Sequence, residues 1–389
     1  MPSFYEFFAG GGMARTGLGP EWRCEFANDI SPMKSVSYLR NFPDADHHFV
    51  QCDINDLKVN SIPGNADLVW GSFPCQDLSL AGAGKGLNGT RSGLIWKLLD
   101  ISKKLKKQGR GPKAIVLENV VGLLNSRGGQ DFYDILAALR RDGFIFGTLM
   151  MDAVHFLPHS RPRIFLVAVD ANQVVIDPHF TNGRMVQRYP WSSPRLDVLW
   201  KEAPTSLRDS WVWWNLPAPP MRRSTIADIV ESHSETWDEP EYTAKLLKLM
   251  APLHLWKVEK ARSIGAEVVG TLYRRTRLVD GTRTQRVEVR FDGISGCLRT
   301  PSGGSSRQRL LIVKGKSIRS RLLSSREAAR LMGIPEHYHL PSSYNDAYQL
   351  AGDGVAVPVV KWLSQYLLLP MLSSSGSRYA TDQIELLYA

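Results

Sequence analysis

Residues 4–12 read FYEFFAGGG, a short apolar run that is followed at once by three glycines. The apolar run predicts a buried strand, and the glycines predict a tight turn into a helix. Glycines at such a turn let a cofactor approach the backbone at the N-terminus of the helix. Alone the turn is weak evidence of function, because many α/β proteins need glycine there simply to reverse the chain.

The same alternation of strand and helix continues to about residue 170. Apolar residues at helical spacing predict helices over 94–105 and 132–139. The predicted strands are 4–8, 24–28, 67–71, 114–118 and 164–169. This order predicts a doubly wound, mostly parallel α/β sheet, in which ligands bind beyond the carboxyl ends of the strands. Site residues are therefore expected in the loops that follow these runs.

The residue composition and the periodicity of the chain change near residue 178. Prolines cluster there, and seven of the 11 tryptophans lie between residues 178 and 293. Helical periodicity returns at 324–332 and at 355–369. The predicted domains are a catalytic, cofactor-binding domain at 1–178 that is completed by 324–372, an inserted smaller domain at 179–323, and a C-terminal tail at 373–389. Most of Trp200, Trp211, Trp213 and Trp214 are expected in a core.

Net charge and its distribution favour a polyanionic partner. The 389-residue chain carries a net charge of +10, with a pI of about 9.4. Seven basic residues and no acidic one lie between Arg299 and Arg321. Clustering of this kind is typical of nucleic-acid binders, although surface solvation explains part of such a balance equally well.

A basic hairpin is predicted in the middle segment. Asp280 and Gly281 form a turn between two apparent strands that carry six arginines, Arg274, Arg275, Arg277, Arg283, Arg286 and Arg290. Their guanidinium groups could contact the phosphates or guanine edges of a nucleic acid. The alternative is a basic hairpin that is merely solvated.

The chain shows neither membrane nor disulfide patterns. It has no uninterrupted run of about 18 apolar residues, and its N-terminus lacks the pattern of a signal peptide, so we expect a cytosolic protein without a membrane span. The cysteines, Cys24, Cys52, Cys75 and Cys297, stand too far apart for a zinc site. Each is by default a small buried residue unless its context indicates otherwise.

Cys75 has such a context. It follows the strand 67–71 in the segment Phe73-Pro74-Cys75-Gln76, and it precedes the glycine-rich stretch 79–93. This is the position of a nucleophile on a loop that can close, although an inert small residue remains the alternative.

Charged residues mark the ends of two other strands. Glu118 directly follows four apolar residues, where a carboxyl group is poorly solvated and suited to general acid catalysis. Asn119, beside it, could equally cap a helix. Arg161 and Arg163 precede the strand 164–169 and, pointing the same way, could hold a planar base by its carbonyl oxygen.

Two aspartates also follow strands. Asp29 ends the second strand, and Asp53 follows the short run 49–52. Taken singly, each is more typical of a turn or a cap. In order after the glycine turn they favour an adenosine-containing cofactor, with Asp29 on the ribose hydroxyls and Asp53 on the adenine amino group.

The motifs described above, taken in their order along the chain, resemble those of the DNA (cytosine-5)-methyltransferases. The resemblance runs from Phe4 to about Leu369 and excludes the middle segment. The matching blocks are Phe8-Ala9-Gly10-Gly11-Gly12, Asp29, Asp53, Phe73-Pro74-Cys75-Gln76, Glu118-Asn119-Val120, His159-Ser160-Arg161-Pro162-Arg163, Arg299-Thr300-Pro301-Ser302-Gly303-Gly304 and Gly352-Asp353-Gly354-Val355. The separation of Pro-Cys-Gln from Glu-Asn-Val is highly specific.

The resemblance implies a Rossmann-like fold that binds S-adenosyl-L-methionine. Phe8 would stack on the adenine, Gly10 and Gly12 would lie along the methionine part, and Asp29 and Asp53 would bind the ribose and the adenine. The predicted cofactor site is completed by Ile30, Ile54, Pro74 and Asp353.

The resemblance also implies the catalytic residues. Cys75 would attack carbon 6 of cytosine, Glu118 would bind and protonate nitrogen 3, and Arg163 would hold the carbonyl oxygen with Arg161 beside it. His159 stands where the family commonly has Gln, and Asp353 where it commonly has Asn; these departures bear on the hydrogen bonds around Arg161 and on the cofactor contact.

The implied substrate is double-stranded DNA with the target cytosine flipped out of the helix. The inserted domain would recognise the target sequence. DNA contacts are predicted for Gln76, Ser79, Arg91, Arg274, Arg275, Arg277 and Arg299. A bacterial or phage modification enzyme, acting as a monomer beside a possible restriction endonuclease of the same specificity, fits this organisation.

Three alternatives are weaker. A tRNA cytosine-5 methyltransferase of similar architecture would carry a Cys-Phe-Thr tripeptide, which this sequence lacks. A catalytically inactive DNA-binding relative would not need Cys75, Glu118 and Arg163 together. A methyltransferase acting on proteins or small molecules would not need the Pro-Cys-Gln nucleophile.

Overall fold

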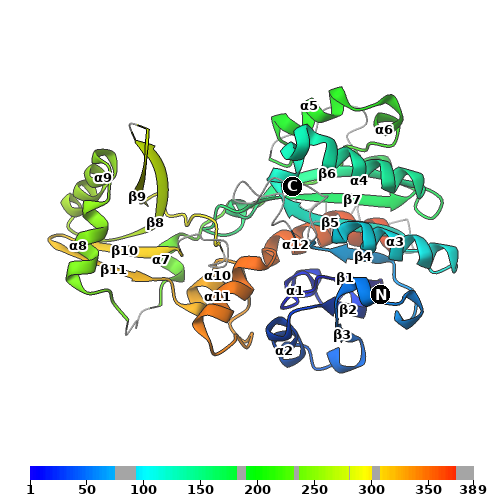
Figure 1. The fold of residues 1–389 in the computed structure, drawn as a ribbon, viewed down its shortest axis with the longest axis horizontal. Helices are drawn as coiled ribbons and strands as arrows, with labels where there is room; N and C mark the ends of the chain where they lie inside the picture. Colours follow the sequence, from blue (N-terminus) through cyan, green and yellow to red (C-terminus); the bar gives the residue numbers. More distant parts are fainter. Residues whose placement is uncertain (75–92, 182–189, 232–235, 280, 300–306, 374–389) are drawn as a thin grey trace, which may run out of the picture. The chain divides into compact units, whose positions relative to one another are not determined.

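The computed structural model describes residues 1–74, 93–181, 190–231, 236–279, 281–299 and 307–373 (Figure 1). The chain divides into two compact units. Unit 1 comprises Met1–Met151, Pro162–Ala218 and Val359–Ala389, and unit 2 comprises Asp152–Arg161 and Pro219–Pro358. Residues 179–218 thus belong to unit 1 and residues 324–358 to unit 2. The functional division proposed from the sequence, with target recognition at 179–323, stays a prediction.

Unit 1 is built on a seven-stranded sheet with the order β3-β2-β1-β4-β5-β7-β6. The strands are β1 Ser3–Phe7, β2 Arg23–Asp29, β3 Phe49–Gln51, β4 Leu68–Gly71, β5 Ala114–Val120, β6 Phe144–Asp152 and β7 Pro162–Asp170. The pairings of β1 with β2 and β4, of β2 with β3, and of β4 with β5 are parallel. The predicted doubly wound, mostly parallel sheet is therefore confirmed, and β6 is an additional strand that the sequence did not indicate.

β7 runs antiparallel to β5. Val120 pairs with Arg163, and Ala114 pairs with Val169. The beginning of β7 therefore lies beside the end of β5. In an all-parallel sheet, the loops before the strands lie at one end of the sheet and the loops after the strands lie at the other end. The reversal of β7 brings Arg163 to the edge where the loops after β4 and β5 begin.

Helices and a continuous apolar core complete unit 1. The helices are α1 Met13–Leu18, α2 Pro32–Asn41, α3 Leu94–Lys107, α4 Gln130–Arg141, α5 Pro194–Glu202, α6 Thr205–Asp209 and α13 Leu369–Leu372, with a π-helical turn at Ser364–Leu368. The helix α12 Val357–Leu363 begins with the last two residues of unit 2 and continues in unit 1. α3 turns Ile95, Leu98 and Leu105 into the core because they recur at helical spacing.

The tryptophan cluster belongs to this core. Trp211, Trp213 and Trp214 are buried, and the Trp211 ring lies 5.8 Å from the ring of Phe132 in α4. The prediction that most of the four tryptophans are core residues is confirmed, but they lie in unit 1 and not in the unit that carries the basic hairpin.

Unit 2 contains a four-stranded antiparallel sheet with the order β11-β10-β8-β9. Its strands are β8 Glu267–Val279, β9 Thr282–Arg290, β10 Arg309–Lys314 and β11 Ser317–Leu322, and its helices are α7 Ile226–Ile229, α8 Pro240–Lys248, α9 Pro252–Ser263, α10 Ser325–Arg330 and α11 Tyr344–Asp353. Leu246 of α8 and Val258 of α9 share a core with Leu272, Val287 and Leu311 of the sheet. The predicted β8–β9 hairpin is confirmed, with Val279 paired to Thr282 across the turn.

One helical stretch, Tyr344–Leu372, is long and apolar enough to cross a membrane by length and composition. The sequence predicted helical periodicity at 355–369, within this stretch, but no membrane span, because charged and polar residues interrupt the apolar run. However, 61% of its most apolar window is buried inside the structure, and the helix is broken between Asp353 and Val357. We interpret it as a set of interior helices.

Candidate active site

The turn after β1 has the backbone that the sequence predicted. Gly10 and Gly12 have φ angles of 58° and 75°, which side chains other than hydrogen rarely tolerate. A Cβ on Gly12 would lie 2.2 Å from the ring of Phe42. Phe8 also adopts a positive φ, of 57°, although it is not glycine. Such a conformation costs on the order of 1–3 kcal/mol and is typical of functional sites.

Asp29 ties the end of β2 to this turn. Its carboxylate is buried, and one oxygen accepts a hydrogen bond from the Gly10 N–H at 2.8 Å. The other oxygen accepts from the Ser31 N–H, also at 2.8 Å. The two contacts fix the carboxylate at the carboxyl ends of two adjacent parallel strands, where the sequence order predicted a cofactor residue.

The other predicted cofactor residues differ in their burial and in the elements that carry them. The carboxylate of Asp53 accepts from the Asn55 N–H at 2.8 Å and so caps a 3₁₀ turn at Ile54–Asp56. The Ile54 side chain is buried in the core, whereas Ile30, just beyond β2, is 62% exposed. Asp353 is exposed at the end of α11 in unit 2. The role of each in cofactor binding stays a prediction.

A polar network beside the turn, buried at Glu6 and Tyr38 and exposed at Asp44, was not predicted from the sequence. Burial raises the pKa of Glu6, in the middle of β1, to about 8. The Tyr38 hydroxyl donates to Glu6 at 3.2 Å. Arg15 of α1 pairs with Asp44 at 2.6 Å and lies 4.3 Å from the Phe42 ring centroid. This network braces α1 against α2; its signal in the sequence was one acidic residue inside an apolar strand.

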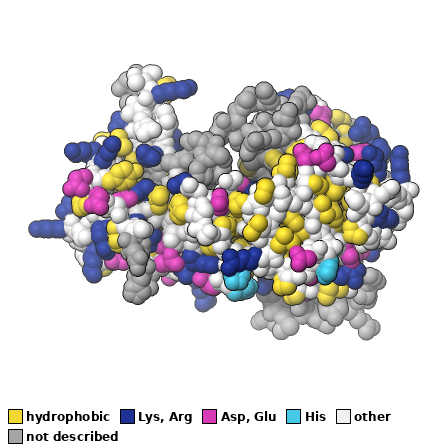
Figure 2. Space-filling view, turned by 60° about the horizontal axis from the view of Figure 1, so that its bottom comes forward, with side chains coloured by type: hydrophobic (Ala, Val, Ile, Leu, Met, Phe, Trp, Pro, Cys, Tyr) yellow, Lys and Arg dark blue, Asp and Glu magenta, His cyan; other side chains and the backbone are white. Residues whose placement is uncertain are grey.

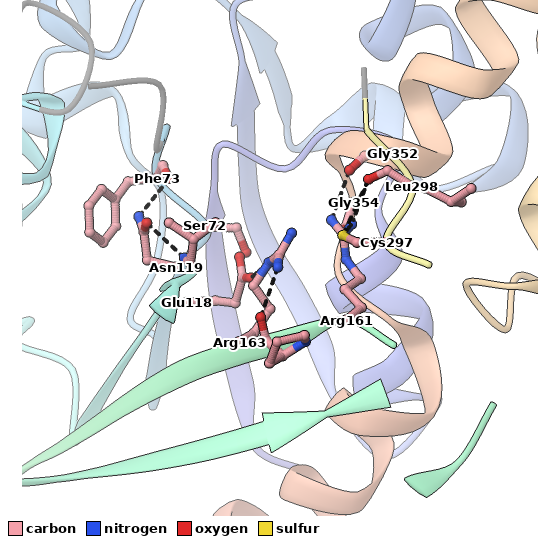
Figure 3. A network of polar contacts seen from close by, with 12 residues as sticks. Ser72, Phe73, Glu118, Asn119, Arg161, Arg163, Cys297, Leu298, Gly352 and Gly354 are labelled. Carbon is pink, nitrogen blue, oxygen red and sulfur yellow. Dashed lines mark hydrogen bonds and ion pairs between the residues drawn. The ribbon is translucent and has the colours of Figure 1, made fainter. Parts of the chain in front are cut away.

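Cys75 and three predicted DNA contacts, Gln76, Ser79 and Arg91, lie outside the described residues. The chain immediately before Cys75 is described. The Asn119 side-chain amide donates to the Phe73 carbonyl at 3.0 Å, and its oxygen accepts from the Val120 N–H at 2.8 Å (Figure 3). Asn119 therefore fixes the backbone two residues before Cys75, a role that was not predicted from the sequence.

Two of the other cysteines are chemically unsuited to nucleophilic attack. Burial raises the pKa of the Cys24 thiol to about 12, with Glu6 adding to the effect. The pKa of Cys52 is also raised, chiefly by burial. Only the thiolate is a good nucleophile, so both thiols are poorly reactive at neutral pH. Neither thiol is therefore a competing candidate, and the nucleophilic role of Cys75 stays a prediction.

Glu118 and Arg163 form an ion pair at the edge of the sheet. The Arg163 Nε lies 3.2 Å from a Glu118 carboxylate oxygen, and both side chains are largely buried (Figure 3). The Arg163 guanidinium also donates to the Pro162 carbonyl at 2.8 Å. The antiparallel pairing of β5 with β7 creates this juxtaposition. A carboxyl group beside a planar guanidinium can address a ring nitrogen and an adjacent carbonyl of a pyrimidine.

Arg161 contacts residues of unit 2. Its buried guanidinium donates to the carbonyls of Gly352 at 2.8 Å and Gly354 at 2.7 Å, and more weakly to the Leu298 carbonyl at 3.3 Å (Figure 3). It also lies 3.4 Å from the sulfur of Cys297. These contacts hold the Arg161 side chain at the end of α11, and its expected part in holding a base beside Arg163 stays a prediction.

The basic hairpin presents an organised arginine face. Strand register brings Tyr273, Arg275 and Arg277 of β8 to the same face as Glu288 of β9. Glu288 accepts from the Tyr273 hydroxyl at 3.0 Å and from the Arg277 Nε at 2.6 Å, and Arg275 lies over the Tyr273 ring at 4.5 Å.

Other predicted DNA contacts are also accessible. Arg274 and Arg299 are exposed. Figure 2 shows Lys and Arg side chains protruding at several points on the surface of unit 2. The basic character that the sequence indicated is therefore available to a partner.

Comparisons with known proteins agree with this geometry. The family model for C-5 cytosine-specific DNA methylase matches residues 3–367. The type II methyltransferase M1.ScrFI of Lactococcus lactis subsp. cremoris is 26% identical over 366 residues, which cover 93% of this chain and 77% of that protein. The type II methyltransferase M.HpaII of Haemophilus parainfluenzae is 25% identical over 387 residues, which cover 94% of this chain and 89% of that protein.

A solved structure shares the fold. The S. pombe Dnmt2 methyltransferase superposes with a TM-score of 0.56 at 19% identity, covering 96% of this chain and all of that chain. The sequence match to the family model spans nearly the whole chain. This protein therefore belongs to the C-5 cytosine-specific DNA methylase family, and it is a DNA (cytosine-5)-methyltransferase.

Proposed function

We propose that this enzyme transfers a methyl group from S-adenosyl-L-methionine to carbon 5 of a flipped cytosine in a specific duplex DNA sequence, through a covalent adduct with Cys75. The observation that carries the proposal is the buried Glu118–Arg163 pair at the end of β5. Asn119, the next residue of β5, anchors the segment that leads into Cys75.

The turn after β1 fits this cofactor. Family and fold are those of S-adenosylmethionine-dependent methyltransferases. Gly10 leaves the backbone uncovered beyond β1, because no atom lies within 4 Å of the place where its Cβ would be, and the Asp29 carboxylate is held beside it. We propose that Phe8 stacks on the adenine and that Asp29 and Asp53 bind the ribose and the adenine. When bound, the cofactor supplies an electrophilic methyl group.

The protein must make a poor carbon nucleophile reactive. The Cys75 thiolate would form a bond to carbon 6 of cytosine while Glu118 gives a proton to nitrogen 3, and carbon 5 then becomes the nucleophilic end of an enamine. Arg163 would hold the carbonyl oxygen. After methylation, a base takes the proton from carbon 5, and the carbon–sulfur bond breaks to restore the Cys75 thiolate. Nitrogen 3 then returns its proton to Glu118, which restores the neutral aromatic ring.

Carbon 6 is inaccessible within a stacked duplex, so the target nucleotide must leave the helix. We propose that the β8–β9 hairpin contacts the DNA through Arg274, Arg275 and Arg277, with Arg299 as a further contact. Gln76, Ser79 and Arg91 would contact the DNA from the stretch around Cys75. The exposed arginine face of the hairpin supports this proposal.

The biological setting proposed here follows from the relatives. Two relatives at 25–26% identity are named type II methyltransferases. We propose that this enzyme is likewise the modification member of a restriction-modification system, acting as a monomer in the cytoplasm of a bacterial or phage-infected cell. A cognate endonuclease would cut the same sequence.

Labelled S-adenosyl-L-methionine incubated with duplex DNA and, separately, with tRNA tests the substrate. Label recovered as 5-methylcytosine in DNA supports the proposal. Label on tRNA but not on DNA would overturn the substrate, and label on neither would favour an inactive DNA-binding relative. Cys75→Ala should abolish transfer and keep DNA binding, whereas Cys52→Ala, at a thiol with a raised pKa, should keep both.

A further inference from the structure

His159 bridges two backbone groups in the interior of unit 2. Its side chain is fully buried. The Nδ1 atom lies 2.9 Å from the Leu331 carbonyl oxygen, and the Nε2 atom lies 3.1 Å from the Leu298 backbone nitrogen. A carbonyl can only accept and a backbone N–H can only donate. The two contacts together therefore require a neutral ring with its proton on Nδ1 and a bare Nε2.

The groups that His159 joins also hold Arg161. His159 accepts from the N–H of Leu298, and Arg161 donates to the carbonyl of the same residue. Leu331 caps the end of α10, while the other acceptors of Arg161, Gly352 and Gly354, lie at the end of α11. The two side chains thus satisfy carbonyls that helix ends leave without intrahelical partners.

Backbone contacts add to this arrangement. The Ser160 N–H donates to the Ser295 carbonyl at 2.9 Å, and the Ser295 N–H donates to the Pro158 carbonyl at 2.8 Å. The segment 158–161 is therefore locked to the segment 295–298, with His159 as the link that can change its charge. Arg163, two residues beyond Arg161, is the proposed ligand of the cytosine carbonyl.

We propose that His159 is a positioning residue that holds Arg161 and the Gly352–Gly354 turn in place only while its imidazole is neutral, so that acid reversibly inactivates methyl transfer through His159. The proposal rests on the proposed function, because Arg163 and Asp353 adjoin the segments that His159 holds. A Gln side chain has one donor and one acceptor end, so it can make the same two hydrogen bonds without titrating.

The surroundings of His159 favour the neutral ring. Burial lowers its pKa below the ordinary value of 6.5, and the Arg161 guanidinium lowers it further, whereas contacts with the Cys297 thiol and the Leu331 carbonyl raise it. Arg161 is the charged group that faces the ring from its own segment, and Cys297 is the titratable group from 295–298. From α10 the contact is the uncharged Leu331 carbonyl.

The sign of the pH effect follows. A histidine with a depressed pKa in the folded state stabilises the protein above its unfolded-state pKa, and this stability is lost as the pH falls below about 6.5 towards the folded-state value. A protonated Nε2 would then point a hydrogen at the Leu298 N–H. Because two donors cannot bond, the link to the segment 295–298 would break.

The test is the pH profile of kcat/KM for methyl transfer to duplex DNA, from pH 5.5 to 8.5, for wild type, His159→Gln and His337→Gln. Below the pKa of one essential group the rate falls about tenfold per pH unit. His159→Gln should keep the activity at pH 8 within a few-fold and should lose less activity in acid than wild type. His337→Gln, at an exposed histidine of the same unit, should follow the wild-type profile.

Two results would overturn the proposal: an acid limb that is unchanged in His159→Gln, or a folded His159→Gln protein without activity at pH 8. His159→Leu removes both hydrogen bonds and should lose activity at every pH; if it does not fold, the Gln variant still decides.

Thermal unfolding across the same pH range gives a readout that does not depend on activity. The Tm of wild type should fall more in acid than that of His159→Gln, and equal falls would contradict the role of His159. If wild type methylates no DNA at any pH, the proposed function fails, and the Tm comparison still decides the inference on His159.

Discussion

Glu118 contributes a carboxyl group that is held at 3.2 Å by Arg163 and largely withdrawn from water. Glu118→Gln tests whether this group acts as an acid. The amide keeps the shape and can still accept from Arg163, but it cannot deliver a proton to ring nitrogen 3. General acid catalysis is worth about 10²–10⁴-fold, so single-turnover methyl transfer should slow by that factor.

DNA binding by Glu118→Gln should stay within a few-fold of wild type, because no phosphate contact is removed. Glu241→Gln, at an exposed glutamate of unit 2, is the matched control and should leave the rate unchanged. A Glu118→Gln enzyme as fast as wild type would rule out Glu118 as the proton donor.

At the scale of elements, the turn between β1 and α1 requires a backbone conformation at Gly10 that favours glycine, and a substitution there tests the role of the turn. Gly10→Ala puts a methyl group where φ is 58° and where no atom lies within 4 Å. The strain costs about 1 kcal/mol of folding free energy, but the methyl group would cover backbone that the cofactor is proposed to approach. We therefore expect a small fall in Tm without cofactor and loss of the Tm increase that S-adenosyl-L-methionine gives.

Gly109→Ala is the matched control for this turn. Gly109 has a φ of 73°, and a methyl group on its Cα would also meet no atom within 4 Å, but it follows the far end of α3. It should show the same small fall in Tm and keep the response to the cofactor. If S-adenosyl-L-methionine raised the Tm of Gly10→Ala as much as that of Gly109→Ala, the turn after β1 would not be part of the cofactor site.

The β8–β9 hairpin is the second element with a testable role. Arg275 stacks on Tyr273 and remains 43% exposed. If it contacts a phosphate, Arg275→Ala should weaken DNA binding and reduce the slope of log K against log salt by about 1. Arg262→Ala, at a surface arginine of α9 paired with Glu259, should leave the slope unchanged. If the slope of log K against log salt were the same for Arg275→Ala and Arg262→Ala, Arg275 would make no phosphate contact, and the hairpin would be a solvated surface only.

At the scale of the whole chain, local patterns predicted the sheet and its edge. The apolar runs located β1, β2, β4, β5 and β7 because buried strands are nearly continuous in hydrophobicity. Periodicity does not report strand direction, so the antiparallel β7 that brings Arg163 to Glu118 was not visible in its own residues.

The limits of sequence reasoning are similar elsewhere in the chain. Tryptophan content and position indicated core residues, and Trp211 and Trp213 indeed pack in the core of unit 1. Composition identifies core residues but not the core to which they belong. The contacts of Asn119 with Phe73 and of His159 with Leu298 and Leu331 join residues far apart in sequence, so no local pattern could indicate them.

The covalent role of Cys75 is the central claim of this account. Duplex DNA with 5-fluorocytosine at the target position tests it, because fluorine at carbon 5 cannot leave as a cation and the last step is blocked. With S-adenosyl-L-methionine present, wild type should form a protein–DNA adduct that survives denaturation in detergent, and Cys75→Ala should form none while Cys52→Ala forms as much as wild type. Methylation of ordinary DNA without any such adduct, or an adduct that persists in Cys75→Ala, would contradict it.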